Sequence, residues 1–150
     1  MQNDVDSGFI DSEGEATSVG IKILTAWHNT SLPPTNDYGA IAGNNSGIFP
    51  DYVMKSAYWT DAGKPQKFQI FGLDTSYSYK FTFYGNRAAT DNRTTNYQIG
   101  DETVSLNAAN NLTNTVSIES VKPDTSGSVT VTLSAGSGSV YGYLNAMVIT

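Results

Sequence analysis

Cysteine is absent from this sequence of 150 residues, and histidine occurs once. The lack of cysteine excludes disulfide bonds and thiolate metal sites, although it does not determine the cellular compartment. The single histidine, His28, cannot form a metal-binding histidine pair, and neither a nucleophile elbow nor a phosphate-binding loop is present. No apolar run approaches the length of a membrane span. The common routes to catalysis are therefore missing, and we do not expect an enzyme.

Basic residues are scarce as well. Eight Lys and Arg residues stand against fourteen Asp and Glu residues, which gives a formal charge of -6. Nucleic-acid binding requires a basic footprint, and anionic membrane surfaces attract clustered cations, so we expect neither as a partner. The length is typical of one domain with a core of its own. We expect residues 1–150 to form a single, monomeric domain.

What the sequence does contain is a series of short β-strands. From Tyr79 to Tyr84, apolar and polar residues alternate, which predicts a strand with one apolar face. A second alternation ends at Ile99, where the pair Gly100-Asp101 predicts a two-residue hairpin into the strand that follows. This part of the chain is therefore β in character.

Further patterns determine the expected fold class. Residues 129–133 alternate, and residues 141–149 carry apolar groups on both faces, which is typical of a central strand in which Tyr143 has a structural role. Residues 50–51, Pro-Asp, favour one short helical turn, whereas residues 28–47 show no period and form a long loop. About eight short strands predict an all-β, two-sheet jelly-roll β-sandwich with antiparallel strands.

Several short segments together form a recognisable pattern. They are Gly20-Ile21-Lys22-Ile23, Phe49-Pro50-Asp51, Tyr58-Trp59, Gly72-Leu73-Asp74, Tyr79-Lys80-Phe81-Thr82-Phe83-Tyr84-Gly85-Asn86-Arg87, Asn92-Arg93-Thr94-Thr95, Val121-Lys122-Pro123-Asp124 and Gly142-Tyr143-Leu144-Asn145-Ala146. The pattern resembles galactose-binding-like jelly-roll modules, which are appended to secreted bacterial polysaccharide-degrading enzymes and to surface proteins. Asn86 stands where that family usually has serine. The resemblance implies a non-catalytic, usually extracellular carbohydrate-binding module, and it bears more strongly on the fold than on the ligand.

A sugar-binding site needs an aromatic plane for the apolar face of a pyranose and rigid polar groups for its hydroxyls. Aromatic residues gather in and beside the long loop, and two arginines flank the loop that follows the strand 79–84. The candidate ligand-binding residues are Trp27, Tyr38, Tyr58, Trp59, Asn86, Arg87 and Arg93.

Some of these candidates have a structural alternative. Tyr58 and Trp59 are neighbours, so on a strand one side chain points inward and the other outward. Arg93 is expected to pair with a carboxylate such as Asp91, which makes Arg87 the better candidate for a ligand contact.

Cofactors are only weakly indicated. Asp11, Glu13 and Glu15 surround Gly14 and place carboxylates at alternate positions, as in a calcium loop, but the full loop pattern is missing. A solvated acidic turn is the preferred interpretation. No cofactor is certain, and a structural calcium ion remains an open alternative.

Two functional hypotheses follow. The leading one is a non-catalytic module that holds a covalently linked parent enzyme, or a cell, on a polysaccharide, outside the cell or at its surface. No signal peptide is visible after Met1, so either the protein is cytoplasmic or Met1 was added to an excised domain. The composition favours a domain excised from a larger secreted protein. The alternative is a structural or adhesive spacer that contacts proteins through residues 28–47. A lyase that uses His28, Tyr38 and Arg87, or an esterase, is a minor third possibility.

The exposed surface distinguishes the first two hypotheses. An open groove lined by Trp27, Tyr58 and Arg87 would favour sugar binding. An exposed apolar patch around Ile41, Ile48 and Phe49 would favour a protein partner.

Overall fold

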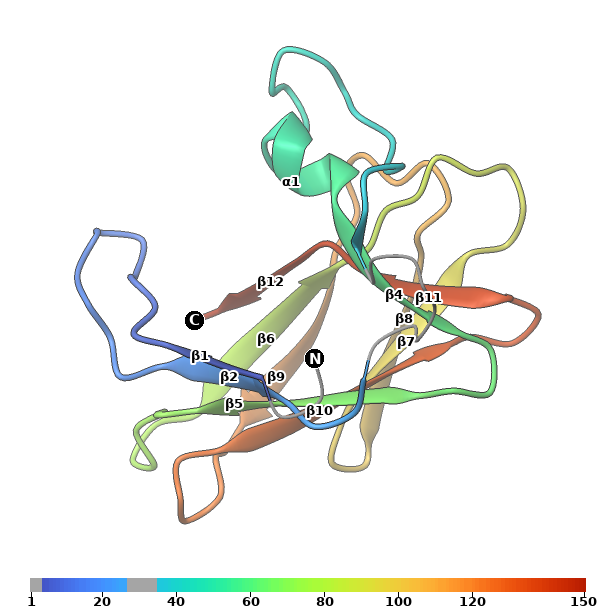
Figure 1. Ribbon diagram of the computed structural model, residues 1–150. Coiled ribbons are helices and arrows are strands. Elements are labelled where there is room, and N and C mark those ends of the chain that lie inside the picture. Colours follow the sequence, from blue (N-terminus) through green and yellow to red (C-terminus); the bar gives the residue numbers. More distant parts are fainter. Residues whose placement is uncertain (1–3, 27–34) are drawn as a thin grey trace.

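The computed structural model describes residues 4–26 and 35–150, which form a two-layer β-sandwich with one short helix (Figure 1). The elements are β1 (Val5–Ser7), β2 (Gly20–Ile23), β3 (Thr35–Asn36), α1 (Asp51–Lys55), β4 (Ala57–Asp61), β5 (Gln66–Phe71), β6 (Tyr79–Tyr84), β7 (Thr94–Ile99), β8 (Glu102–Asn107), β9 (Val116–Val121), β10 (Val129–Ala135), β11 (Tyr141–Leu144) and β12 (Ala146–Ile149). The predicted all-β antiparallel sandwich is confirmed, but its two layers contain three sheets rather than the expected two. The described residues contain twelve strands rather than about eight, because several short edge strands have no sequence signal of their own.

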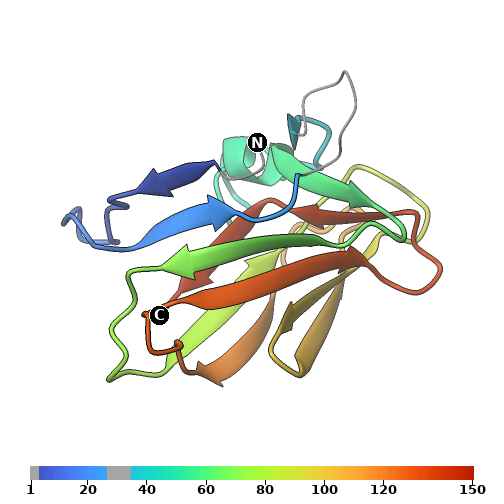
Figure 2. The same ribbon diagram turned by 60° about the horizontal axis from the view of Figure 1, so that its bottom comes forward.

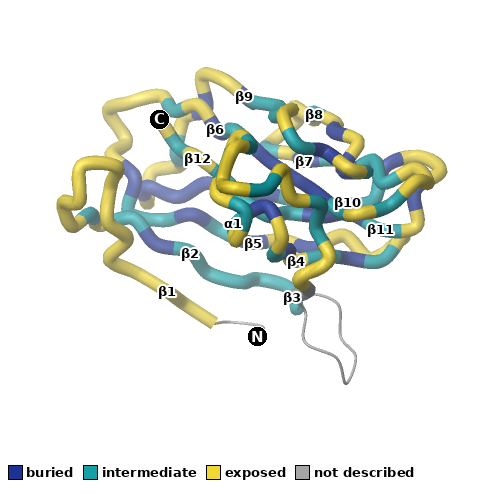
Figure 3. The backbone as a smooth tube through the Cα atoms, turned by 90° about the horizontal axis from the view of Figure 1, so that it is seen from above, coloured by how far each residue is buried: buried dark blue, intermediate teal, exposed yellow. Residues whose placement is uncertain are grey.

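The two layers are built from antiparallel pairs. One layer is a six-stranded sheet in the order β1-β2-β5-β10-β7-β8, and β5 and β10 run side by side across it in Figure 2. The other contains two three-stranded sheets, β12-β6-β9 and β11-β4-β3. In the last of these, β11 also contacts β10 and β7. β1 forms the outer edge of the large sheet and is exposed along its length (Figure 3).

Alternating residues of the facing sheets form the main core. Phe81 and Phe83 of β6 are fully buried, as their alternation predicts. Phe83 stacks on Tyr97 of β7, with ring centroids 4.6 Å apart and an interplanar angle of 6°. The predicted hairpin is also present, because Ile99 pairs with Glu102 around a two-residue turn.

The end of the chain corrects one prediction. Residues 141–149 do not form one central strand, because the chain breaks at Asn145 into β11 and β12, which are edge strands of two different sheets. The Asn145 backbone N–H donates to the Tyr84 carbonyl at 2.9 Å, and its side chain accepts from the Asn86 N–H at 2.7 Å and donates to the Met54 carbonyl at 2.9 Å. These bonds replace a strand ladder at that position.

The other local predictions concern a helix and an acidic turn. The helical turn predicted after Pro50 is α1, which begins at Asp51. Near the N-terminus, the Asp11 side chain accepts hydrogen bonds from the N–H groups of Glu13 and Glu15, each at 2.9 Å, as expected of an acidic turn. Within residues 4–26 and 35–150, no helix combines the length and the apolar character that a bilayer crossing requires.

Tyr84 makes the fold sensitive to alkaline pH. Its side chain is fully buried, its ring lies 5.1 Å from that of Phe49, and its hydroxyl donates to the Asn111 carbonyl at 2.6 Å. Burial raises the pKa of Tyr84 from 10.0 to about 12. The folded state holds the proton more tightly than the unfolded state. The resulting stability is therefore fully present below about pH 10 and is lost as the pH rises through about 12.

We expect the urea concentration at the unfolding midpoint to decrease as the pH is raised from 10 to about 12. In Tyr84→Phe this decrease should be less steep. At neutral pH, Tyr84→Phe should be less stable, by about 1 kcal/mol, because it loses the hydrogen bond to Asn111. Urea unfolding followed by circular dichroism across this pH range measures both effects. An unchanged alkaline slope in Tyr84→Phe would contradict the assignment.

Candidate functional site

The candidate site begins with aromatic rings on two paired strands. Trp59 of β4 lies directly opposite Tyr143 of β11, and Tyr141 precedes Tyr143 by two residues. Residues that are opposite each other, or two apart, lie on the same face of a sheet. The Trp59 and Tyr141 rings meet edge to face with centroids 5.2 Å apart, and those of Tyr141 and Tyr143 lie 6.4 Å apart. We call Trp59, Tyr141 and Tyr143 the aromatic wall.

Two arginines complete a pocket beside the aromatic wall. Arg87 follows β6 and Arg93 precedes β7, and together with the wall they line a pocket of about 150 Å³. The backbone of the buried residue Ala108 links them. Its carbonyl accepts from the Arg87 N–H at 2.8 Å, and its N–H donates to the Arg93 carbonyl at 3.1 Å. The two arginine backbones are therefore held in one place by the fold.

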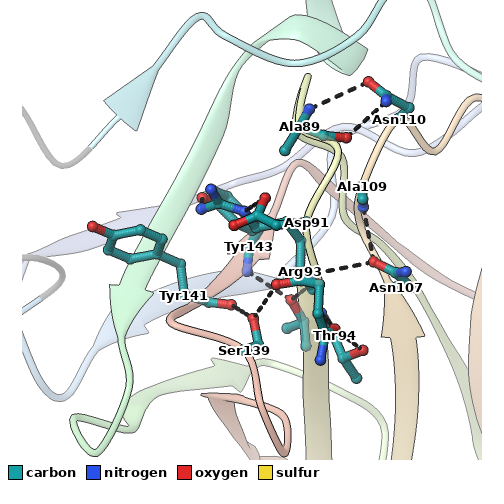
Figure 4. Close-up of polar contacts among 12 residues, drawn as sticks. Ala89, Asp91, Arg93, Thr94, Asn107, Ala109, Asn110, Ser139, Tyr141 and Tyr143 are labelled. Atoms are coloured by element: carbon teal, nitrogen blue, oxygen red, sulfur yellow. Dashed lines mark hydrogen bonds and ion pairs between the residues drawn. The ribbon is translucent and has the colours of Figure 1, made fainter.

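The Arg93 side chain is fixed by polar and aromatic contacts (Figure 4). Its Nε donates to Asp91 Oδ1 and its Nη1 donates to the Tyr143 hydroxyl, both at 2.8 Å. Its Cζ lies 5.1 Å from the ring centroid of Tyr141. The hydrogen bond from Arg93 lowers the pKa of Asp91, whereas burial raises the pKa of Tyr143 even though Arg93 favours its phenolate form. Arg93 thus presents a fixed positive charge against the aromatic wall.

Arg87 is supported from a different direction. Its Cζ lies 4.9 Å from the ring centroid of Tyr38, and the N–H of the next residue, Ala88, donates to the Tyr38 carbonyl at 2.8 Å. Tyr38 is 66% exposed, so this stack lies at the protein surface. Arg87 therefore connects an exposed ring with the pocket.

The structure brings together three of the seven candidate residues in the pocket lining, Trp59, Arg87 and Arg93. Tyr38 is adjacent through its stack on Arg87. The expected pairing of Arg93 with Asp91 is confirmed, at 2.8 Å.

The remaining candidates lie elsewhere. Tyr58 is 38% exposed and, as the neighbour of Trp59 on β4, points to the opposite face of that strand, so it does not line the described pocket together with Arg87. Trp27 lies outside the described residues.

Asn86 is placed inside the fold and not on its surface. It is fully buried, and its Nδ2 donates to the carbonyls of Ala40 at 2.5 Å and Met54 at 3.1 Å. Its Oδ1 accepts from the Ala40 N–H at 3.3 Å. These bonds attach α1 and the loop before it to the end of β6, so the polar atoms of the Asn86 side chain are engaged inside the fold.

Sequence reasoning missed two members of the aromatic wall. No pattern in the sequence marks Tyr141 as a site residue, and the sequence predicts a structural role for Tyr143. Tyr143 is indeed buried, but its hydroxyl accepts the Arg93 hydrogen bond and its ring lines the pocket. The spacing Tyr141-Gly142-Tyr143 places both rings on one face, and this was the only local signal.

Metal binding finds no support in the part of the chain that the structure describes, where no three His, Asp or Glu side chains gather to hold an ion. Among the described residues, the pocket lining contains no carboxylate. Its chemistry is that of aromatic surface and guanidinium donors.

No known family model matches this sequence, and no curated protein matches it. Two solved structures are distantly similar. A family 61 carbohydrate-binding module, TmCBM61, in complex with β-1,4-galactotriose aligns with a TM-score of 0.40 and 15% identity over 64% of this chain and 70% of the module. An F5/8 type C domain from Bacteroides fragilis aligns with a TM-score of 0.35 and 11% identity over 74% of this chain and 79% of that domain. Both alignments have TM-scores below 0.5, and neither assigns a ligand or a site to this chain.

Proposed function

We propose that this chain is a non-catalytic carbohydrate-binding module that holds a covalently linked enzyme, or a cell, on a polysaccharide. The observation that carries the proposal is the pocket in which the aromatic wall lies beside Arg87 and Arg93. Aromatic rings pack against the apolar face of a pyranose, and guanidinium groups donate hydrogen bonds to its oxygens. We place this activity outside the cell or at its surface.

The composition of the pocket favours binding over turnover. Hydrolysis of a glycosidic bond commonly needs two carboxyl groups across a cleft. The lining provides none, and Asp91, which lies close by, is already bonded to Arg93. The proposal therefore includes no reaction.

A panel of soluble and insoluble polysaccharides, including a β-1,4-galactan, tests the proposal when binding and reducing-end or unsaturated products are measured in the same tubes. We expect binding without product. Arg87→Ala should weaken that binding by about tenfold or more, because a hydrogen bond from a charged group contributes about 1.5–3 kcal/mol. Lys122→Ala is the matched control, because it also removes an exposed cationic side chain, but at the opposite end of β6. Lys122 follows Val121, which pairs with the first residue of β6, whereas Arg87 follows the end of that strand.

Tryptophan fluorescence locates the ligand independently. The chain contains two tryptophans. Trp27→Phe leaves Trp59 as the reporter, and Trp59→Phe leaves Trp27. A sugar in the pocket should change the emission of the Trp27→Phe protein. Product formation, or binding that is indifferent to Arg87→Ala, would contradict the proposal.

One observation favours the spacer as a second candidate. Ile41 is 52% exposed, Ile48 is 43% exposed and Tyr52 of α1 is 78% exposed, whereas Phe49 packs on Tyr84. If the chain is a spacer without a sugar site, no glycan will bind. A protein partner that contacts these side chains, or a second copy of the chain, would then lose affinity for the Ile41→Ser, Ile48→Ser double variant.

A further inference from the structure

Tyr38 is an exposed aromatic residue at the border of the pocket. Its side chain is 66% exposed, and Arg87, whose Cζ lies 4.9 Å from the centre of its ring, lines the pocket. Single exposed aromatic side chains are common on protein surfaces and indicate no function by themselves. Two further properties of Tyr38, the rigidity of its backbone and its place beside a small pocket, point to a ligand.

The backbone around Tyr38 is anchored to two other segments. The Tyr38 carbonyl accepts a hydrogen bond from the Ala88 N–H at 2.8 Å. The Gly39 N–H donates to the Lys55 carbonyl at 2.9 Å. A side chain at position 39 would collide with the Met54 carbonyl, so glycine is required for this close approach to the end of α1. The loop therefore lies firmly against both α1 and the segment that follows β6.

These bonds hold the ring in place before a ligand arrives. The Asn86 side chain bonds to both backbone groups of Ala40, so residues 38–40 are all anchored. A tyrosine ring is positioned by only two side-chain torsions, and the contact with Arg87 restricts them further. Binding to a ring that is already fixed costs little conformational entropy. An exposed, pre-ordered aromatic surface is therefore available beside the pocket.

The size of the pocket limits how much of a polysaccharide it holds. Its volume of about 150 Å³ is below the range of about 300–1,000 Å³ that is typical of sites which enclose a drug-sized ligand. Only a short part of a chain fits inside, and the neighbouring units lie on the surface outside. Arg87 forms the boundary, because it lines the pocket and also lies over the ring of Tyr38.

We propose that Tyr38 forms a second sugar subsite outside the pocket, so that the module recognises at least two consecutive units of a polysaccharide chain. This inference rests on the proposed carbohydrate-binding function. One unit occupies the pocket beside the aromatic wall, and a neighbouring unit packs its apolar face on the exposed ring of Tyr38. Arg87 supports that ring from the side of the pocket, and this role requires no free hydrogen-bond donor on the guanidinium group.

The test measures affinity against chain length. The ligands are β-1,4-linked oligomers of galactose and of glucose with one, two and three units, and fragments of the same lengths from any other polysaccharide that the panel retains. Each is titrated into the protein and followed by nuclear magnetic resonance. We expect the affinity to rise by about fivefold or more between one unit and two or three, because an aromatic ring contacts the added unit. Binding of longer oligomers with no gain over a single unit would overturn the inference.

Substitutions at Tyr38 show whether its ring causes this gain. Tyr38→Ala should bind a single unit within about twofold of the unmodified protein and lose most of the gain, whereas Tyr38→Phe, which keeps the ring, should retain it. Tyr77→Ala is the matched control, because Tyr77 is 64% exposed but lies before β6, at the opposite end of that strand from Arg87. This variant should behave as the unmodified protein does.

The remaining outcomes separate this inference from the proposed function. If Tyr38→Ala kept the full gain, or weakened the binding of one unit and of longer oligomers by the same factor, Tyr38 would not form a subsite. The carbohydrate-binding function would still stand. Failure of every glycan to bind would overturn the proposed function itself.

Discussion

Phe83→Ala is expected to lower the free energy of unfolding by about 4 kcal/mol, because it removes a large ring from a fully packed interior and leaves a cavity. Phe83 is fully buried between the two layers. Its ring stacks on Tyr97 at 4.6 Å and lies 6.5 Å from that of Phe81. The loss would be a large fraction of the stability of a domain of this size, which is typically about 5–15 kcal/mol.

Urea unfolding followed by circular dichroism measures this effect. Tyr77→Ala is the matched control, because it also removes an aromatic ring, but Tyr77 is 64% exposed and the change should be within about 0.5 kcal/mol. A loss in Phe83→Ala no larger than that in Tyr77→Ala would show that the sheets do not pack on each other through this residue.

Asn86→Ala is expected to cost about 3 kcal/mol of folding stability, because it removes three hydrogen bonds of a fully buried side chain and leaves both backbone groups of Ala40 without this partner, although the Met54 carbonyl keeps its bond from Asn145. The side chain bonds to Ala40 through both of its polar atoms and to the Met54 carbonyl. The loop held in this way carries Tyr38, on which Arg87 stacks. The variant should therefore also loosen the Arg87 side of the pocket.

Thermal and urea unfolding test the prediction. Asn96→Ala is a suitable control, because this substitution removes an exposed hydrogen bond, which the Asn96 side chain accepts from the Ser105 hydroxyl at 2.7 Å. The free energy of unfolding should change by no more than about 1 kcal/mol. If Asn86→Ala kept full stability and lost only glycan affinity, Asn86 would be a ligand contact, as its sequence position first indicated.

The parts of the fold that the sequence predicts are those with a local period. The alternation at residues 79–84 predicts the buried positions of Phe81 and Phe83, and the pair Gly100-Asp101 predicts the β7–β8 hairpin. Tyr84 belongs to the polar row of the same alternation and is nevertheless fully buried, because Phe49 from a distant loop covers it. A contact of this kind has no signature in the strand itself.

The site is predictable to a similar extent. Arg87 and Arg93 were identifiable because they flank a loop between predicted strands, and the pocket contains both. Tyr141 and Tyr143 were not, because their role depends on the pairing of β11 with β4, which places them beside Trp59. The register of strands that are far apart in the chain is set by the packing of the whole sandwich, and no short segment encodes it.

Nuclear magnetic resonance of the arginine side chains tests the central claim most directly. The chain has two arginines, so a spectrum of its Nε–H groups contains two signals, and Arg87→Lys assigns them. If the pocket between the aromatic wall and the two guanidinium groups is the carbohydrate site, a glycan that binds will shift both signals with the same affinity. Glycan binding that leaves both arginine signals unchanged would place the site elsewhere and contradict the account.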